Sequence, residues 1–456
     1  MYGMKKYLEH NLASQIFSTR DIWRLVFPVI VDQSFIIGLA IFNTAMISSA
    51  GVAAVSAVNM VESVNIFLIN IFIALATGGT VLVAQARGKK DERLVQQSAI
   101  GTVVTVFLVA LSLSVVMLAF HQLILMGLFG GSEHLVMQNA QIYFIGSVLS
   151  YTGLAVVEAV CGVFRGVADT QTSLFLSFFT NFLYVLLNML FIVGFHWGIV
   201  GMAVALNIAR WLGAFIAIGV LVFRRHSLRI RIKELVLVRW QMIKKILTIG
   251  LPFAAEQLFF NGGKIIVQIF IVQLGTLALT ANAVANSLTM MLEIIPGALA
   301  LAIVPIVGQS IGAKDFASVP KFWRSFLWLA SISTLVTGGI LIVGYDQFIQ
   351  LFQVPTLVEQ QVFQIVLLVT IARILAWPIS FITPAALRAT GDAKYTSIVS
   401  LTTMWCVRIV LGYLLGIVFQ LGLIGIWGAM CFEWFIRGGI FARRILQGKW
   451  QTNKLV

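Results

Sequence analysis

Charge is the property that this sequence has least of. Only 11% of its 456 residues are charged, 60% are hydrophobic, and the mean hydropathy is +0.98. A soluble globular protein carries about 25% charged residues. The shortage of charge therefore excludes an ordinary soluble domain and indicates a chain that lies largely within lipid.

Signatures of catalysis and metal binding are also missing. The three cysteines, Cys161, Cys406 and Cys431, occur in apolar runs without the spacing of a metal site, so we interpret them as packing residues. Residues 88–90, GKK, lack the upstream glycine and the hydroxyl of a nucleotide-binding loop. We therefore expect no catalytic residue, no metal and no organic cofactor, and we predict that the chain is not an enzyme.

Long apolar runs, in contrast, are abundant. A run of about 20 residues crosses a hydrocarbon core of about 30 Å. Backbone groups in lipid must be bonded within the protein, which favours helices, and a barrel would need alternating strands that the sequence lacks. The predicted fold class is an all-α membrane protein of twelve transmembrane helices. Their expected spans are 24–48, 57–80, 96–119, 137–161, 172–194, 199–223, 245–273, 280–304, 322–344, 361–386, 396–419 and 423–443.

Basic residues are absent from every second loop between these runs. Most of the lysines and arginines lie in the alternate loops, near the ends of the runs or at the two ends of the chain. Arg210, Lys264, Arg373 and Arg408 fall well inside apolar runs, as does Arg437. Because basic loops stay in the cytoplasm, both termini are predicted to be cytoplasmic, in a bacterial plasma membrane. The net charge of +14 is then explained by contact with anionic lipid, and we expect no nucleic-acid partner.

The chain is an internal duplication. Residues 28–91 match residues 252–315 without a gap, at a constant offset of 224. The matching pairs include Pro28 and Pro252, Asp32 and Glu256, Gln33 and Gln257, Gly88 and Gly312, and Asp91 and Asp315. With six spans in each copy, both copies enter the membrane in the same direction, so we expect two lobes related by a two-fold axis along the membrane normal. The predicted division is an N-terminal lobe at 1–223, a basic cytoplasmic linker at 224–244 and a C-terminal lobe at 245–456.

Two carboxylates stand out within the apolar runs, Asp32 and Glu256, each four residues after a proline. A charge in hydrocarbon is costly and usually serves function, so we predict that both bind a coupling ion or proton. The alternative is that they bond only the backbone that the prolines leave free. Gln33 and Gln257, which follow them, either bond between helices or contact substrate.

Other polar residues form a stripe in the eighth span. Asn282, Asn286, Thr289 and Glu293 share one helical face, and a polar face favours a water-filled cavity over lipid. Glu62 in the second span, together with the intramembrane cations Lys264, Arg373 and Arg408, is a candidate charge partner. We interpret Glu158, Arg210 and the i, i+4 pair Glu433 and Arg437 as structural.

Four loop motifs carry a family resemblance. VAQARGKKD (83–91), VGQSIGAKD (307–315), FRGVADT (164–170) and LRATGDAKYTS (387–397) resemble the loops after the second, eighth, fourth and tenth helices of multidrug and toxic compound extrusion (MATE) transporters. The resemblance implies twelve helices in two lobes, and export of organic, often cationic, drugs in exchange for H⁺ or Na⁺. The same superfamily includes flippases for lipid-linked oligosaccharides.

The resemblance does not extend to three acidic residues that many family members have inside the helices. Those positions are Asn43, Phe260 and Trp377 in this chain. A coupling role for Asp32 and Glu256 is therefore not implied by the family motif. The predicted substrate cavity comprises Gln33, Asn43, Gln257, Phe260, Asn282, Asn286, Thr289, Glu293 and Trp377.

The sequence as a whole favours a monomeric secondary active antiporter. We expect it to export small organic compounds, with H⁺ or Na⁺ as the coupling ion and membrane lipid as its surroundings, by rocking of the two lobes. The alternative is an exporter of the same architecture for a lipid-linked precursor, a flavin or a peptide. A channel or receptor is disfavoured because it has no use for a duplicated proline–carboxylate motif.

The topology can be tested by labelling single cysteines introduced into a cysteine-free variant. We expect Ser132→Cys to react with an impermeant maleimide from outside the cell. Lys89→Cys and Ser227→Cys should react only after the membrane is permeabilised. Labelling of Ser227→Cys in intact cells would reverse the predicted orientation.

Overall fold

The computed structural model describes residues 14, 16–48, 51–131, 133–223 and 240–452. Within these residues all regular secondary structure is helical, and twelve segments are long and apolar enough to cross a membrane, which confirms the predicted fold class. Ser132, Ser227 and residues 224–239 of the predicted linker lie outside the described part of the chain, as does the side chain of Asn43.

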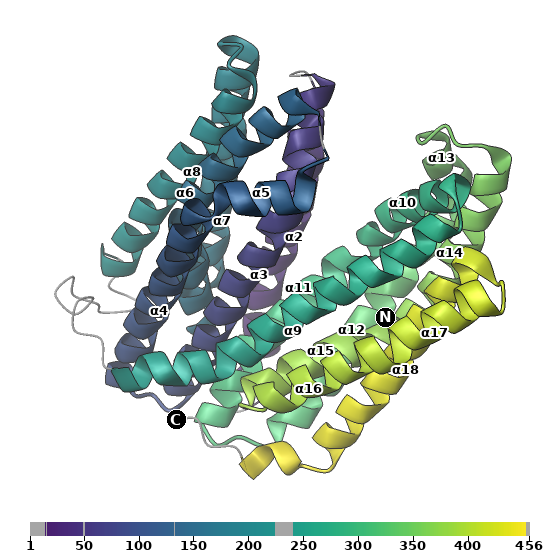
Figure 1. Ribbon diagram of the computed structural model, residues 1–456. Helices are drawn as coiled ribbons and strands as arrows, with labels where there is room; N and C mark the ends of the chain where they lie inside the picture. The colour runs from purple at the N-terminus through teal and green to yellow at the C-terminus, as the bar shows by residue number, and fades with distance from the viewer. Residues whose placement is uncertain (1–13, 15, 49–50, 132, 224–239, 453–456) are drawn as a thin grey trace. The chain divides into compact units, whose positions relative to one another are not determined.

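The first half of the chain supplies six spans and one short connecting helix (Figure 1). They are α2 (Thr19–Ser48), α3 (Val52–Gly88), α4 (Glu92–Ala119), α5 (His121–Phe129, the connector), α6 (His134–Gly166), α7 (Thr170–Asn188) with the π-helix η1 (Met189–Gly194), and α8 (Gly198–Phe223). Helix α6 is central, because it packs against α3, α4, α7 and α8.

The second half repeats this order with more interruptions. Its helices are α9 (Trp240–Gln273), α10 (Thr276–Met290), η3 (Met291–Glu293), α11 (Ile294–Gly312), α12 (Ser318–Val343), α13 (Tyr345–Gln350), α14 (Thr356–Leu375), α15 (Trp377–Ala389), α16 (Ala393–Thr403), η4 (Met404–Ile409), α17 (Val410–Tyr413), η5 (Leu414–Val418), α18 (Gly422–Leu446) and η6 (Lys449–Thr452). Here α15 packs against α11, α12 and α18.

The duplication is visible in the backbone itself. Residues with positive φ recur in the second half at the offset of 224 residues, or at 223 for Ala168 and Gly391. The pairs are Gly51 (97°) with Gly275 (94°), Lys90 (59°) with Lys314 (62°), Ala168 (69°) with Gly391 (98°), His196 (55°) with Gln420 (55°), and Gly198 (53°) with Gly422 (59°). Left-handed backbone is costly for residues other than glycine, so its recurrence at matching positions indicates that the two halves share the same loop geometry.

The four motif loops have a common structural role, which is to end one helix and begin the next. At Lys90 and Lys314 the chain turns through a left-handed residue, and the following N–H bonds back to the last turn of the helix. The next residue is an aspartate. The Asp91 carboxylate accepts from the backbone N–H of Leu94 at 3.0 Å, and Asp315 accepts from the Ser318 hydroxyl at 2.6 Å.

The chain forms two compact units whose boundaries differ from the predicted ones. One unit, here called the N-lobe, spans Phe27–Ala254, and the other, the C-lobe, combines the residues up to Val26 with those from Ala255 onward. The first turns of α2 and α9 therefore pack with the opposite half of the sequence. The Phe17 ring meets the Phe322 ring edge-on at 6.4 Å, because the entry to α2 lies against α12.

Three interruptions distinguish the helices of the C-lobe. A 3₁₀ turn at Met291–Glu293 precedes Pro296, and α14 stops at Leu375 before Pro378 restarts the chain as α15. The third is the π-helix η4, which replaces the regular helix at Met404–Ile409. The matching segments of α3, α6 and α7 are continuous. The continuous spans predicted at 280–304, 361–386 and 396–419 are therefore broken, at places where prolines or π-turns change the backbone hydrogen bonding.

A close glycine contact between α3 and α9 allows a test of the N-lobe packing. A Cβ atom added to Gly78 would lie 3.0 Å from the backbone nitrogen of Gly250. We expect Gly78→Val to destabilise the protein by about 1–3 kcal/mol, because the backbones must separate. Gly219→Val is the matched control, since nothing lies within 4 Å of a Cβ atom there. The thermal midpoint in detergent should fall only for Gly78→Val, and equal midpoints would contradict this packing.

Candidate functional site

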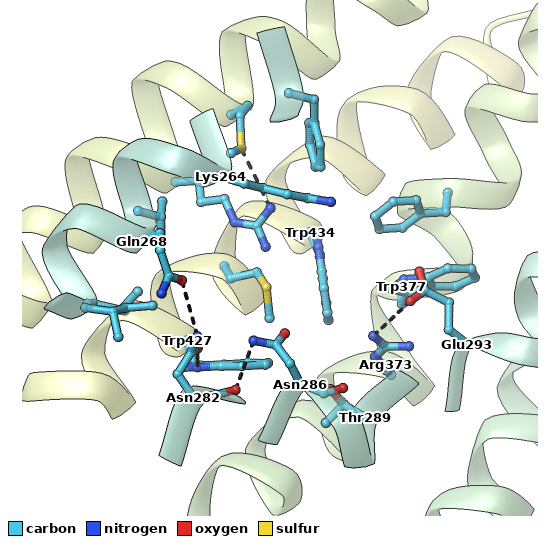
Figure 2. A pocket seen from close by; sticks show the side chains of 18 residues that line it. Lys264, Gln268, Asn282, Asn286, Thr289, Glu293, Arg373, Trp377, Trp427 and Trp434 are labelled. Carbon is cyan, nitrogen blue, oxygen red and sulfur yellow. Dashed lines mark hydrogen bonds and ion pairs between the residues drawn. The ribbon is translucent and has the colours of Figure 1, made fainter. Parts of the chain in front are cut away.

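The C-lobe contains a cavity of about 310 Å³ where its helices are interrupted (Figure 2). Side chains from α9, α10, η3, α14, α15, η4 and α18 line it. All three interruptions contribute: η3 supplies Glu293, the break before α15 brings Arg373 and Trp377 to the cavity, and η4 supplies Met404 and Arg408. Irregular backbone within a membrane protein is tolerated where it lines a cavity, which is the case here.

The predicted polar stripe lies along one wall of this cavity. Asn282, Asn286, Thr289 and Glu293 all line it. The amide of Asn282 is held on both sides: its oxygen accepts from the Trp427 indole at 3.1 Å and its nitrogen donates to Gln268 at 3.4 Å (Figure 2). These bonds orient the wall and link α10 to α9 and α18.

Cations outnumber acids in the same cavity. Its charged lining consists of Lys264, Arg373, Arg408 and Glu293. Glu293 lies 3.6 Å from the Nη2 atom of Arg373, and Arg408 donates a hydrogen bond to the Met404 sulfur at 3.7 Å. Candidate charge partners Lys264, Arg373 and Arg408 are thus brought together with Glu293, whereas Glu62 lies in the other lobe.

Aromatic rings complete the C-lobe cavity. Trp377 stacks on Phe381 at 4.6 Å, and the Arg373 guanidinium lies 6.0 Å from the Trp377 ring and 5.8 Å from the Trp434 ring. Phe260 faces two cations of the cavity, with Lys264 at 5.4 Å and Arg408 at 5.7 Å. Phe260 and Trp377 occupy positions where the family resemblance would imply acids, so aromatic rings replace carboxylates here.

The N-lobe has a separate cavity of about 390 Å³ with the opposite charge balance. Its charged lining consists of Glu62, Glu158 and Arg210. Glu158 and Arg210, interpreted from the sequence as structural, therefore belong to the cavity wall. The sequence could not indicate that these charges meet, because isolated charges in different helices give no periodic signal and their meeting depends on tertiary packing.

A hydrogen-bond network holds Glu62 at this cavity. Its Oε1 atom accepts from the Tyr143 hydroxyl at 2.6 Å and from the Asn65 amide at 3.0 Å. Asn65 in turn accepts from the Tyr151 hydroxyl at 2.5 Å. Arg210 donates to Ser150 at 2.7 Å. The two tyrosines were missed in the sequence because aromatic residues in an apolar helix usually indicate packing alone.

Asp32 is buried in the N-lobe at α2. The Ser177 hydroxyl of α7 lies within hydrogen-bonding reach of its carboxylate, and Arg165 is close enough to attract it. Its Oδ1 atom is buried and has no hydrogen-bond partner among the described residues. Arg165 also lies 3.7 Å from Glu158. Two carboxylates therefore share one arginine.

Glu256 occupies the equivalent place in the C-lobe but is fully engaged. Its Oε2 atom accepts from the Ser397 hydroxyl at 3.0 Å and lies 3.5 Å from the Arg388 guanidinium. Glu256, predicted together with Asp32 as a coupling residue, does not line the C-lobe cavity. The reason is the ion pair with Arg388, the arginine that matches Arg165 in the duplication.

The remaining predicted residues divide between the cavities and the helix surfaces. Phe260 and Trp377 line the C-lobe cavity, whereas Gln33 and Gln257, both half-buried, line neither cavity. The pair predicted at Glu433 and Arg437 is present, with an N–O distance of 3.3 Å. Residues that the sequence did not indicate, among them Gln268, Trp427 and Trp434, come from α9 and α18 and reach the cavity only through the fold.

Comparison with known proteins gives a consistent result. The family model MatE matches residues 28–190 and 252–414, one match in each half of the chain. The chain is 27% identical over 436 residues to the uncharacterised transporter YisQ of Bacillus subtilis, covering 93% of this chain and 94% of YisQ. It is 25% identical over 460 residues to the "Probable multidrug resistance protein NorM" of Thermotoga maritima, covering 99% and 97%.

Solved structures show the same fold. A MOP-superfamily transporter from Pyrococcus furiosus, whose binding pocket is described as having reverse polarity, superposes with a TM-score of 0.87 at 16% identity over 95% of this chain and 96% of its own. A multidrug resistance MATE family transporter in an outward-facing conformation also gives 0.87 at 16% identity, over 95% and 96%. With twelve apolar helices, a duplicated chain and a family match in each half, this protein is a multi-pass membrane transporter of the MatE family.

Proposed function

We propose that the protein is a secondary active antiporter that exports organic compounds in exchange for H⁺ or Na⁺. The observation that carries the proposal is Asp32, a buried carboxylate with one oxygen left without a partner among the described residues. A carboxylate held in this way can bind a proton or cation at low cost, and intramembrane carboxylates are the usual carriers of ion coupling.

The arrangement around Asp32 supports a two-state switch. Arg165 attracts both Asp32 and Glu158, and Arg210 is a second cation near Glu158. When Asp32 binds a proton or Na⁺, its attraction for Arg165 is lost, and Arg165 is left to Glu158. Because Glu158 lines the N-lobe cavity, ion binding at Asp32 would change the charge balance of that cavity.

Multidrug export is the cargo assignment that the relatives support. NorM of Thermotoga maritima, which matches this chain over nearly the full length of both, is named as a probable multidrug resistance protein. Two cavities of 310 and 390 Å³ fall at the lower end of the usual range for small organic ligands. We propose that a monomer in the plasma membrane, with both termini in the cytoplasm, carries out the exchange by rocking of its lobes.

The coupling role of Asp32 is tested in proteoliposomes with pH and Na⁺ gradients imposed separately. Export of a fluorescent drug should depend on one of the gradients in the wild type. Asp32→Asn should reduce that gradient-driven export to background while substrate binding remains, because the amide preserves shape but cannot titrate.

Glu92→Gln is the matched control for this experiment. It removes a carboxylate of the N-lobe whose side chain is 63% exposed, so transport should be unchanged. Wild-type export by Asp32→Asn under both gradients would refute coupling through this residue and leave Glu158 as the next candidate.

Glu256 is expected to behave differently from Asp32, because it is paired. Glu256→Gln leaves the buried Arg388 without this carboxylate and should destabilise the protein by about 1–3 kcal/mol. The double variant Glu256→Gln with Arg388→Gln should recover part of the loss. Thermal unfolding in detergent measures all three. A Glu256→Gln protein as stable as the wild type, but unable to couple, would show that Glu256 has the role assigned to Asp32.

A further inference from the structure

We propose that the C-lobe cavity is a binding site for organic anions, in which a carboxylate, sulfonate or phosphate group is attached to a flat aromatic body. This inference rests on the proposed function, since it names the class of compound that the exporter would carry.

The charged side chains that line the C-lobe cavity do not balance. Lys264, Arg373 and Arg408 line the cavity with a single carboxylate, that of Glu293. Glu433 is the acidic neighbour of Arg408, but it is already bonded to Thr403 at 3.0 Å and to Arg437 at 3.3 Å. Unpaired cations away from bulk water are costly, and an anionic ligand would relieve that cost.

Arg373 is buried, and only part of its guanidinium has a partner among the described residues. Its side chain is 9% exposed, and Glu293 lies beside only its Nη2 atom. The Nε and Nη1 atoms are buried and have no hydrogen-bond partner among the described residues. A guanidinium presents donors in a planar fork that matches an oxyanion. Arg373 thus offers unsatisfied donors at the cavity wall, where Figure 2 shows it beside Glu293.

The backbone departs from regular helix near Arg373 and at Arg408. Arg373 lies in the last turn before the break at Ala376, and Arg408 lies within the π-helix η4. The corresponding segments of the N-lobe are regular helix. Single π-turns occur frequently at functional sites, and broken membrane helices mark binding sites in transporters. The irregular backbone segments therefore coincide with two of the cations, and they bring both Arg373 and Arg408 to the same cavity.

The aromatic lining indicates the body of the ligand. Trp377, Phe381, Trp427 and Trp434 surround the cavity together with Phe260. Flat rings stack on such side chains, while the Trp434 indole N–H, which has no hydrogen-bond partner among the described residues, and the amides of Gln268 and Asn286 offer polar contacts. An aromatic acid would satisfy the cations and the rings at once, and the volume of about 310 Å³ suits a small ligand of this kind.

The N-lobe cavity provides an internal comparison. It has the same place in the duplicated chain order but contains two carboxylates and one arginine. If the fold itself required a cationic cavity, the cavities of both lobes would carry an excess of cations. The cationic balance is therefore specific to the C-lobe and predicts a preference for anions there.

The test measures equilibrium binding of three naphthalene probes to the purified full-length protein, with no ion gradient. The probes are 1-naphthalenesulfonate, 1-naphthalenemethanol and 1-naphthylmethylammonium, which differ mainly in charge. We expect the sulfonate to bind at least about tenfold more tightly than the ammonium compound, the difference typical of one charge-assisted hydrogen bond. Equal binding of the three probes would overturn the proposal.

Variants locate the binding within the molecule. Lys264→Gln and Arg408→Gln should each weaken sulfonate binding by about tenfold, and Lys264→Arg should restore most of it. Glu293→Gln should strengthen binding, because it removes the competing carboxylate from Arg373. Arg324→Gln is the matched control, an exposed cation of the C-lobe outside the cavity, and should have no effect. Sulfonate binding that is unchanged in Lys264→Gln and Arg408→Gln would contradict this site.

An anionic lipid headgroup has the same chemistry as a soluble organic anion, so the binding is repeated in nanodiscs. Sulfonate binding that is equal in phosphatidylcholine and phosphatidylglycerol identifies soluble anions as the ligands. Displacement by phosphatidylglycerol, lost in Lys264→Gln, identifies a lipid headgroup at the same anion site. Because no gradient is applied, failure of this binding leaves the coupling role of Asp32 intact, and failure of coupling leaves the anion site intact.

Discussion

The cost of holding a charge away from water organises the interior of this protein. Most buried charges are neutralised by a partner: Arg437 by Glu433, Arg444 by Asp392 at 2.8 Å, and Arg388 by Glu256. Several buried charged groups keep an atom without a hydrogen-bond partner among the described residues: Asp32, Glu433 and Arg437 keep one each, and Arg373, although 3.6 Å from Glu293, keeps two. We propose that Asp32 in the N-lobe and Arg373 at the C-lobe cavity are where the two lobes bind ligands of opposite charge.

The two lobes derive from one duplicated sequence, yet their interiors have diverged. Their loops retain left-handed residues at matching positions, and an aspartate beside one such turn in each lobe, Asp91 or Asp315, bonds to the start of the next helix. Divergence is concentrated in the helices, where the C-lobe has acquired the 3₁₀ turn, the break at Ala376 and the π-helix η4. The outcome is one cavity with an excess of carboxylates and one with an excess of cations. Duplication thus preserved the scaffold while the two sites came to differ in polarity.

Much of the fold could be predicted from the sequence, because apolar runs of membrane length and a gapless repeat are strong signals. The helical spacing of Asn282, Asn286, Thr289 and Glu293 also predicted one cavity wall correctly. What the sequence could not supply was the pairing of single charges from distant helices. Glu256, predicted as a coupling residue, pairs with Arg388, and Glu158, interpreted as structural, pairs with Arg165 and also lines the N-lobe cavity. Those pairings depend on which helices pack together, and the spacing of residues along the sequence does not indicate them.

We infer that the two lobes bind different ligands: a coupling ion at Asp32 in the N-lobe and an organic anion in the C-lobe cavity. This inference is tested most directly by a crystal or cryo-EM structure of the protein with 4-bromo-1-naphthalenesulfonate, in which bromine marks the ligand. We predict ligand density in the C-lobe cavity, with the sulfonate among Lys264, Arg373 and Arg408 and the ring against Trp377. Density confined to the N-lobe cavity, beside Glu62 and Glu158, would contradict the account.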